Sequence, residues 1–296
     1  MATPAVVPSG PRSLSRRIAL SLLRIVVLVY LGLCLLLYFA QDFLVFPAPK
    51  HYAAHTPIEA NLNFEDLHIP VDHAGQIHAW YIPAATSSDN VLLYFHGNGY
   101  CIEQTAVPSI GEVTPLHQTG ANVLMADYRG YGTSSPGTAN ENRVYEDGRA
   151  ALNYLTQVRK VPIHNIILVG RSIGTGVAME LAKENPGVGG LILISPFTST
   201  SAIAGRVWYM RMLPLAILGH NQFNNLSKIG DVHAPLFIAV GDDDRLTPPS
   251  MAQALMERAN SPKHLYIVPG ADHNGMFQVG QPELVGQIRD FVQGLR

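Results

Sequence analysis

The chain has 296 residues, of which 47% are hydrophobic and 14% charged, and its net charge is −2 at pH 7. Charged residues make up about a quarter of an average soluble domain, so this chain is poor in them. The apolar content excludes a disordered protein, and the scattered Lys and Arg residues form no basic surface for nucleic acid. Two cysteines, Cys34 and Cys101, are too few for a disulfide framework. Zinc spacings and nucleotide-binding glycine motifs are also missing, so we expect no metal, no cofactor and no nucleic-acid partner.

The first feature along the chain is an apolar segment over residues 18–40, whose single charge is Arg24. As a helix, this segment extends about 35 Å, which is enough to cross the hydrocarbon core of a bilayer. Positive charges lie toward its N-terminal end, at Arg12, Arg16, Arg17 and Arg24, and the first acidic residue is Asp42. The positive-inside rule therefore predicts a cytoplasmic tail over 1–17, a single-pass anchor over 18–40, and a body over 41–296 on the non-cytoplasmic side.

Three other interpretations of this segment are weaker. A cleaved signal peptide has a shorter apolar core, and residues 38–40 (Tyr-Phe-Ala) make a poor cleavage site. A lipoprotein signal ending at Cys34 would have a small residue where Leu33 stands. A buried core helix is typical of 10–14 apolar residues rather than of this length. We therefore favour the membrane anchor.

In the body, short runs rich in Val, Ile and Leu alternate with longer segments of helical period. Residues 64–71 and 76–83 predict an antiparallel pair joined by a turn at 72–75. Six further strands without polar alternation are typical of parallel strands buried on both faces, over 90–95, 121–126, 165–169, 190–194, 235–240 and 263–268.

Helical segments fill the gaps between these strands, over 101–117, 141–158, 173–184, 250–258 and 282–295. The alternation predicts an α/β fold with a doubly wound, mostly parallel sheet of about eight strands. About 40 residues separate Ile194 from Pro235, which is too many for an ordinary connection. We expect a small helical cap over about 197–230, in which Trp208 and Met212 contact an apolar part of the substrate.

The motif Gly170-Arg171-Ser172-Ile173-Gly174 has the pattern G-x-S-x-G and lies between a predicted strand and a predicted helix. Such a strand-turn-helix elbow exposes a serine hydroxyl in a strained turn. By itself the pentapeptide is a common chance match, and a glycine-rich turn with an incidental serine is the alternative. Its position predicts that Ser172 is a nucleophile.

A serine nucleophile needs a base and a carboxylate that orients the base. Downstream, three aspartates (Asp242, Asp243 and Asp244) follow one predicted strand, and His273 follows the last strand. The order Ser, Asp, His is that of the α/β-hydrolases, and each residue comes after the carboxyl end of a strand, where such sheets place their sites. We favour Asp244 as the acid and His273 as the base, whereas Asp242 and Asp243 suit turn and capping positions.

An oxyanion hole needs two backbone N–H groups directed at the developing charge. The loop His96-Gly97-Asn98-Gly99 follows the strand over 90–95. We expect the N–H groups of Asn98 and Ile173 to form this hole and His96 to brace the loop.

Together these residues resemble the α/β-hydrolase superfamily and, within it, the BEM46-like group of ABHD-type, membrane-anchored serine hydrolases. The resemblance covers most of the chain and rests on ordered motifs at 41–47, 96–99, 127–134, 170–174, 226–229, 244–248 and 271–273. It implies a serine hydrolase fold and supports Asp244 as the acid, but it does not define a substrate.

The leading hypothesis is a hydrolase of carboxylic esters or thioesters, acting on a small-molecule or lipid-like acyl substrate. A serine peptidase or amidase with the same triad is the nearest alternative. A non-catalytic interaction module on the same fold is a third, which the intact triad spacing disfavours.

Overall fold

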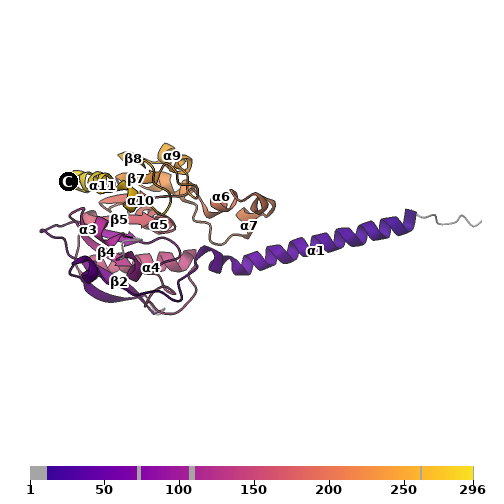
Figure 1. The fold of residues 1–296 in the computed structure, drawn as a ribbon, viewed down its shortest axis with the longest axis horizontal. Helices are drawn as coiled ribbons and strands as arrows, with labels where there is room; N and C mark the ends of the chain where they lie inside the picture. Colours follow the sequence, from indigo (N-terminus) through magenta and orange to yellow (C-terminus); the bar gives the residue numbers. More distant parts are fainter. Residues whose placement is uncertain (1–11, 72–74, 107–110, 261, 296) are drawn as a thin grey trace, which may run out of the picture. The chain divides into compact units, whose positions relative to one another are not determined.

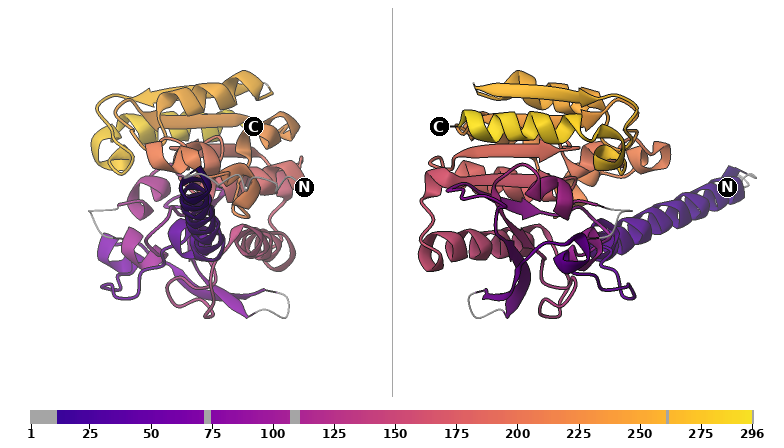
Figure 2. Two further views of the ribbon diagram at one scale, coloured as in Figure 1. Left: turned by 90° about the vertical axis from the view of Figure 1, so that its right-hand side faces the viewer. Right: turned by 60° about the vertical axis from the view of Figure 1, so that its left-hand side comes forward.

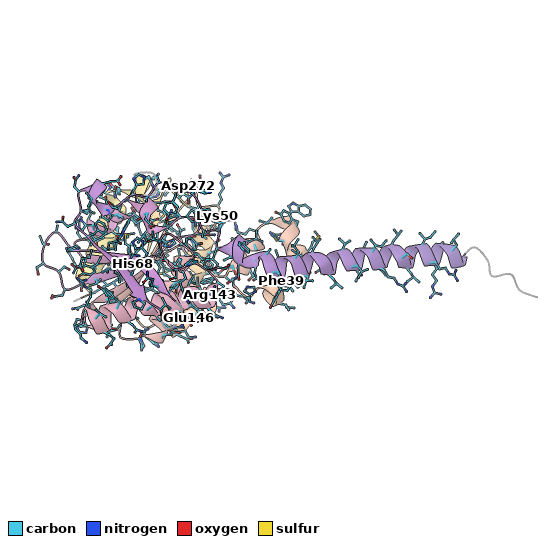
Figure 3. The ribbon with its side chains drawn as sticks, turned by 90° about the horizontal axis from the view of Figure 1, so that it is seen from below. Phe39, Lys50, His68, Arg143, Glu146 and Asp272 are labelled. Carbon is cyan, nitrogen blue, oxygen red and sulfur yellow. The ribbon has the colours of Figure 1, made fainter. Side chains whose placement is uncertain are left out.

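The computed structural model describes residues 12–71, 75–106, 111–260 and 262–295 (Figure 1). The chain divides into two compact units, Met1–Gln41 and Asp42–Arg296. Helix α1, Arg12–Val45, extends beyond both ends of the predicted span over 18–40. Within the described ranges, it is the one helix that is long and apolar enough to cross a membrane. Its apolar side chains, Phe39 among them, project outward and are almost all exposed (Figure 3).

The second unit is built on one eight-stranded sheet in the order β1-β2-β4-β3-β5-β6-β7-β8. Strand β2 pairs antiparallel with β1 and with β4, and all the other neighbours are parallel. The strands are β1 Glu65–Pro70, β2 Gln76–Ile82, β3 Val91–Phe95, β4 Asn122–Ala126, β5 Ile166–Arg171, β6 Gly190–Ile194, β7 Leu236–Gly241 and β8 Lys263–Val268. The predicted α/β fold with about eight mostly parallel strands is confirmed. Of the predicted turn over 72–75, residues 72–74 lie outside the described residues.

Side chains alternate across the sheet and so divide the core into two layers. In β3, Leu93 and Phe95 pack on one face, and Leu92 and Tyr94 on the other. Helices cover both faces (Figure 2). Residues of α4 Glu141–Asn153, α5 Gly174–Glu184 and α9 Pro249–Arg258 belong to the first layer. Residues of α2 Ile102–Thr105, α3 Val113–His117, α10 Met276–Gly280 and α11 Glu283–Gly294 belong to the second.

The helix expected over 101–117 is not continuous. Helix α2 ends at Thr105 and α3 begins at Val113, and residues 107–110 lie outside the described residues. Gly111 has a φ of 56°, a left-handed conformation that a right-handed helix cannot include. The apolar residues in this segment therefore belong to two short helices, not one, and both helices pack on the same face of the sheet.

The remaining connections between strands contain short helical elements. Near the first strands and around β5 these are η1 Pro57–Ala60, the π-helical turn η2 Tyr154–Val158 and η3 Ile163–Asn165. Between β6 and β7, where the cap was expected, lie α6 Thr200–Ala204, η4 Trp208–Met212, α7 Leu215–Leu218, α8 Asn225–Lys228 and η5 Ile229–Asp231. None of these five elements exceeds five residues, so the segment is helical without a long amphipathic helix.

The turn from β5 to α5 brings two backbones into close contact. A Cβ atom built on Gly174 would lie 2.2 Å from the carbonyl oxygen of Phe95 in β3. One on Gly170 would lie 2.4 Å from the carbonyl oxygen of Gly174. Only glycine fits at these two positions, because carbonyl groups of the backbone cannot move aside as a flexible side chain can.

We expect Gly174→Ala to lower the free energy of unfolding by about 3 kcal/mol or more, since the added methyl group must push α5 away from β3. Gly286→Ala in α11 is the matched control, because no heavy atom lies within 4 Å of its Cβ position. The control should be neutral or stabilise the protein by up to about 1 kcal/mol. Urea unfolding of the full chain in detergent measures both. Equal stability of the two variants would contradict the proposed packing constraint.

Candidate active site

Ser172 lies at the turn between β5 and α5, at the end of the sheet where the parallel strands terminate. Its φ of 50° is left-handed, which is uncommon for a residue with a side chain. The Ser172 N–H donates to the carbonyl oxygen of Ile194 at 2.9 Å, so the strained turn is held by the neighbouring strand β6. Ser172 lines a cavity of about 590 Å³.

His273 and Asp244 reach Ser172 from loops that follow two other strands. The Nε2 atom of His273 lies 2.9 Å from the Ser172 Oγ atom, and its Nδ1 atom lies 2.8 Å from the Asp244 Oδ2 atom. Asp244 follows β7, and His273 follows β8. The structure thus brings together the three residues that the sequence analysis proposed as a triad, within hydrogen-bonding distance of one another.

Asp244 is the aspartate that faces the histidine, and its carboxylate is fully engaged. Its Oδ1 atom accepts the N–H groups of Leu246 at 2.9 Å and Thr247 at 2.8 Å, and its Oδ2 atom accepts the Thr247 hydroxyl at 2.8 Å. Burial of the carboxylate opposes ionisation, but the hydrogen bonds from His273 and Thr247 outweigh it and lower the pKa of Asp244. Asp244 is therefore an anion at neutral pH.

The two adjacent aspartates have other partners. Asp242 accepts the Gly270 N–H at 2.7 Å, which closes the turn after β8. Asp243 is exposed and pairs with Arg245 at 3.4 Å. Sequence analysis missed Thr247, whose hydroxyl also lies 3.1 Å from the His273 Nδ1 atom.

The loop after β3 supplies one wall of the cavity, including Gly97 and Asn98. The Gly97 N–H donates to the Tyr100 hydroxyl at 2.9 Å and is therefore occupied. Neither Asn98 nor Ile173 has a hydrogen bond from its backbone N–H among the described residues. Both groups remain available to a ligand.

A buried charged group that sequence analysis did not identify connects the three loops. Arg171 and Glu112 form a buried ion pair, and Arg171 also donates to the Tyr100 hydroxyl at 2.9 Å. The Arg171 Nη2 atom donates to the carbonyl oxygens of His273 and Asn274, at 3.2 and 3.3 Å. Burial disfavours the guanidinium ion, but Tyr100 and Glu112 outweigh this and raise the pKa of Arg171. Arg171 also lines the cavity beside Ser172, and its place next to the serine in the G-x-S-x-G motif was the available indication.

Trp208 and Met212 do not line this cavity, and they are 73% and 64% exposed to solvent. The expected contact with substrate is therefore absent from the described lining. The five residues of η4 complete fewer than two turns, and their apolar side chains point outward. The aliphatic side chain that does line the cavity is that of Leu246.

No group of His, Cys, Asp and Glu side chains suited to a metal lies at this cavity in the part of the chain that the structure describes. The one such group, His78, Glu103 and Asp127, lies outside the cavity lining.

Comparison with known proteins agrees with this architecture. A family described as the alpha/beta hydrolase fold matches residues 90–216. An uncharacterised protein of Mycobacterium tuberculosis is 31% identical over 95% of this chain and 97% of its own length. Human alpha/beta hydrolase domain-containing protein 17B is 30% identical over 73% of this chain and 71% of its own. The chain belongs to the alpha/beta hydrolase fold family.

Solved structures share the fold of this hydrolase. An esterase from Pyrococcus furiosus superposes with a TM-score of 0.70 over 83% of this chain and 97% of its own, at 22% identity. The family and the fold support hydrolysis of a small-molecule substrate in general terms.

Proposed function

We propose that this chain is a membrane-anchored serine hydrolase of carboxylic esters or thioesters with acyl-type substrates. The observation that carries the proposal is the unbroken contact from Ser172 through His273 to Asp244, with heavy-atom distances of 2.9 and 2.8 Å. These are the distances that a general base needs to reach a nucleophile and its orienting carboxylate. The esterase among proteins of similar fold adds support for ester substrates.

In the proposed mechanism, the Ser172 Oγ atom attacks the acyl carbon while the His273 Nε2 atom accepts the hydroxyl proton. The resulting oxyanion accepts hydrogen bonds from the N–H groups of Asn98 and Ile173. His273 then gives its proton to the leaving alkoxide or thiolate, which departs as the carbon–oxygen or carbon–sulfur bond breaks. Water then attacks the acyl carbon while His273 accepts its proton. The bond between this carbon and the Ser172 Oγ atom breaks, His273 returns the proton to Oγ, and the carboxylic acid leaves. Asp244 stays ionised and stabilises the imidazolium.

We expect Ser172→Ala to lower kcat/KM for p-nitrophenyl esters more than a thousandfold and to abolish labelling by a fluorophosphonate. Asp244→Asn should cost about ten-thousandfold, because His273 is then held in the wrong tautomer. Asp243→Asn is the matched control and should change activity less than about threefold. Although Asp243 lies at the cavity wall, its side chain is exposed and pairs with Arg245 rather than with His273.

Full labelling of the Ser172→Ala variant would place the nucleophile elsewhere. A larger loss in Asp243→Asn than in Asp244→Asn would overturn the choice of acid. Faster hydrolysis of aminoacyl amides than of any ester would favour the peptidase alternative, and an inert wild-type protein would favour the interaction module.

The acyl chain is proposed to lie in the cavity beside Ser172, against the side chain of Leu246. Burying methylene groups is worth about 0.8 kcal/mol each, so kcat/KM should rise with acyl length from acetyl onward until the cavity is filled. Leu246→Ala should lower kcat/KM for the octanoyl ester several-fold and so flatten this rise, whereas Met212→Ala should leave the dependence on acyl length unchanged. Kinetics with acetyl to dodecanoyl esters measure both. A profile that falls from acetyl onward, or a response to Met212→Ala alone, would contradict the acyl site.

The proposed topology places residues 1–17 in the cytoplasm, 18–40 across the membrane, and the hydrolase domain over 41–296 on the other side, with 197–230 as its cap. It is supported by the length and exposure of α1 and by Arg16, Arg17 and Arg24 at its N-terminal end. We expect the chain to resist carbonate extraction and the domain to be protected from protease on the cytoplasmic face. A soluble product beginning near Gln41 would instead indicate a cleaved signal.

A further inference from the structure

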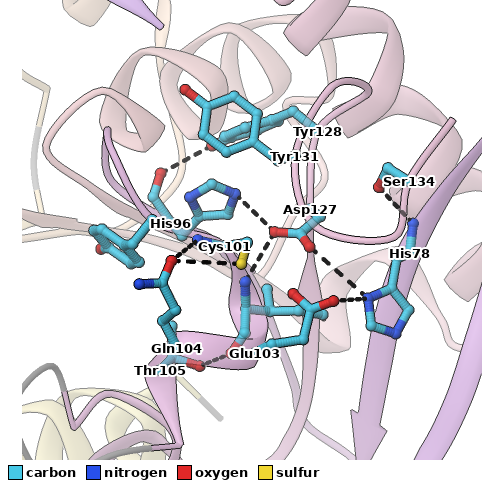
Figure 4. A network of polar contacts seen from close by, with 12 residues as sticks. His78, His96, Cys101, Glu103, Gln104, Thr105, Asp127, Tyr128, Tyr131 and Ser134 are labelled. Atoms are coloured by element: carbon cyan, nitrogen blue, oxygen red, sulfur yellow. Dashed lines mark hydrogen bonds and ion pairs between the residues drawn. The ribbon is translucent and has the colours of Figure 1, made fainter. Parts of the chain in front are cut away.

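Three ionisable side chains meet in the protein interior, away from the lining of the active-site cavity (Figure 4). They are His78 from β2, Glu103 from α2 and Asp127, which follows β4. Glu103 is 4% exposed, and the other two are as deeply buried. The His78 Nδ1 atom lies 3.3 Å from Glu103 Oε1 and 3.8 Å from Asp127 Oδ2. One ligand atom from each residue lies within 4.8 Å of the others.

The atoms that face one another here are in ion-pair contact but form no hydrogen bond. Both carboxylate oxygens of Glu103, the Oδ2 atom of Asp127 and the Nδ1 atom of His78 are buried without one. Leaving a buried carboxylate unpaired costs several kcal/mol, so such groups are normally paired or bound to a metal. Four buried atoms of this chemistry lie close together without a hydrogen bond, which is the ligand set that a cation would need.

The other polar atoms of His78 and Asp127, in contrast, have close polar partners. The His78 Nε2 atom lies 2.6 Å from Asp66 Oδ1, so the Nδ1 atom of the same ring faces Glu103 and Asp127. Asp127 Oδ1 accepts the Ile102 N–H at 2.9 Å and lies 3.1 Å from the His96 Nε2 atom. A carboxylate or backbone group on the far side of each ligand is the usual arrangement around protein-bound metals.

We propose that His78, Glu103 and Asp127 bind one Zn²⁺ ion. Zinc takes imidazole nitrogen and carboxylate oxygen at about 2.0–2.2 Å in tetrahedral geometry, which separates neighbouring ligands by about 3.4 Å. The observed separations of 3.3 and 3.8 Å match this spacing. Mg²⁺ and Ca²⁺ prefer ligand sets made of oxygen alone.

Gly132 is part of the same site. It has a φ of 51°, and a Cβ atom at this position would lie 2.3 Å from Asp127 Oδ2 and 2.7 Å from Glu103 Oε2. Any side chain here would therefore press against the two carboxylates that bind the ion. Glycine keeps this space free.

The site also explains why an ion would matter to the fold. Asp127 lies against His96 and Ile102, at the two ends of the loop that contains Asn98. An ion at Asp127 would fix this loop to β2 and α2. Its role is thus structural, and the inference does not depend on the proposed hydrolysis.

A proton on His78 is the competing explanation. With Nε2–H bound to Asp66, the second N–H would face Glu103 at 3.3 Å without hydrogen-bond geometry. The protonated ring would lie 3.8 Å from Asp127 Oδ2, and Glu103 Oε2 would still have no hydrogen bond. A divalent ion would bind one atom of each of the three residues directly, whereas a proton on His78 leaves them in longer ion pairs.

The test measures the metal content and thermal unfolding of the full chain, purified in detergent without a histidine tag. We expect close to one zinc per chain by mass spectrometry after dialysis against a weak chelator. Removal with a strong chelator should lower the Tm by several degrees, and added ZnCl₂ should restore it. Glu103→Gln should lower zinc affinity at least tenfold and abolish this restoration.

Glu59→Gln is the matched control, because Glu59 also pairs with a histidine, His55 at 2.6 Å, but on the surface. It should keep full zinc content. If Glu103→Gln does not fold, Asp66→Asn, which acts from outside the site, should weaken zinc binding 10–100-fold. Absence of zinc in the wild-type protein with no Tm response to ZnCl₂ would overturn the proposal, as would full zinc content in both Glu103→Gln and Asp66→Asn.

Discussion

The close approach of α5 to β3 is the constraint on which the rest of this structure depends. Gly174 lies against the carbonyl oxygen of Phe95, so α5 begins in direct contact with the C-terminal end of β3. Ser172 is then held in a left-handed turn at the edge where β5, β7 and β8 all end. Loops from these strands bring His273 and Asp244 to the serine, so one backbone contact sets the geometry of the whole candidate site.

Around this contact, buried charges are used to position loops rather than to add stability. Arg171 links the turn to the loop of His273 through two carbonyl oxygens, and Glu112 neutralises it. Asp244 likewise depends on Thr247 for a second set of hydrogen bonds. An unpaired buried charge is costly in free energy. Each buried pair therefore holds the two loops that carry its residues in one relative position.

The cluster of His78, Glu103 and Asp127 differs from these pairs because four of its buried polar atoms have no hydrogen bond. The proposed zinc site departs from the expectation, drawn from sequence spacing, that the chain has no metal site. Its three residues come from a strand, a helix and a loop, and they are 25 and 24 residues apart along the chain. No short motif joins them, and only the pairing of β2 with β4 brings His78 beside Asp127.

The sequence by itself determined the strands, the sheet and the line of Ser172, Asp244 and His273. Apolar runs and glycine spacing are local properties, and the order of strands then places their following loops at one edge. Tertiary structure alone decided which side chains share a cavity. Leu246 rather than Trp208 lines it, and Glu112 pairs with Arg171, because side-chain contacts between distant segments depend on packing that no local pattern encodes.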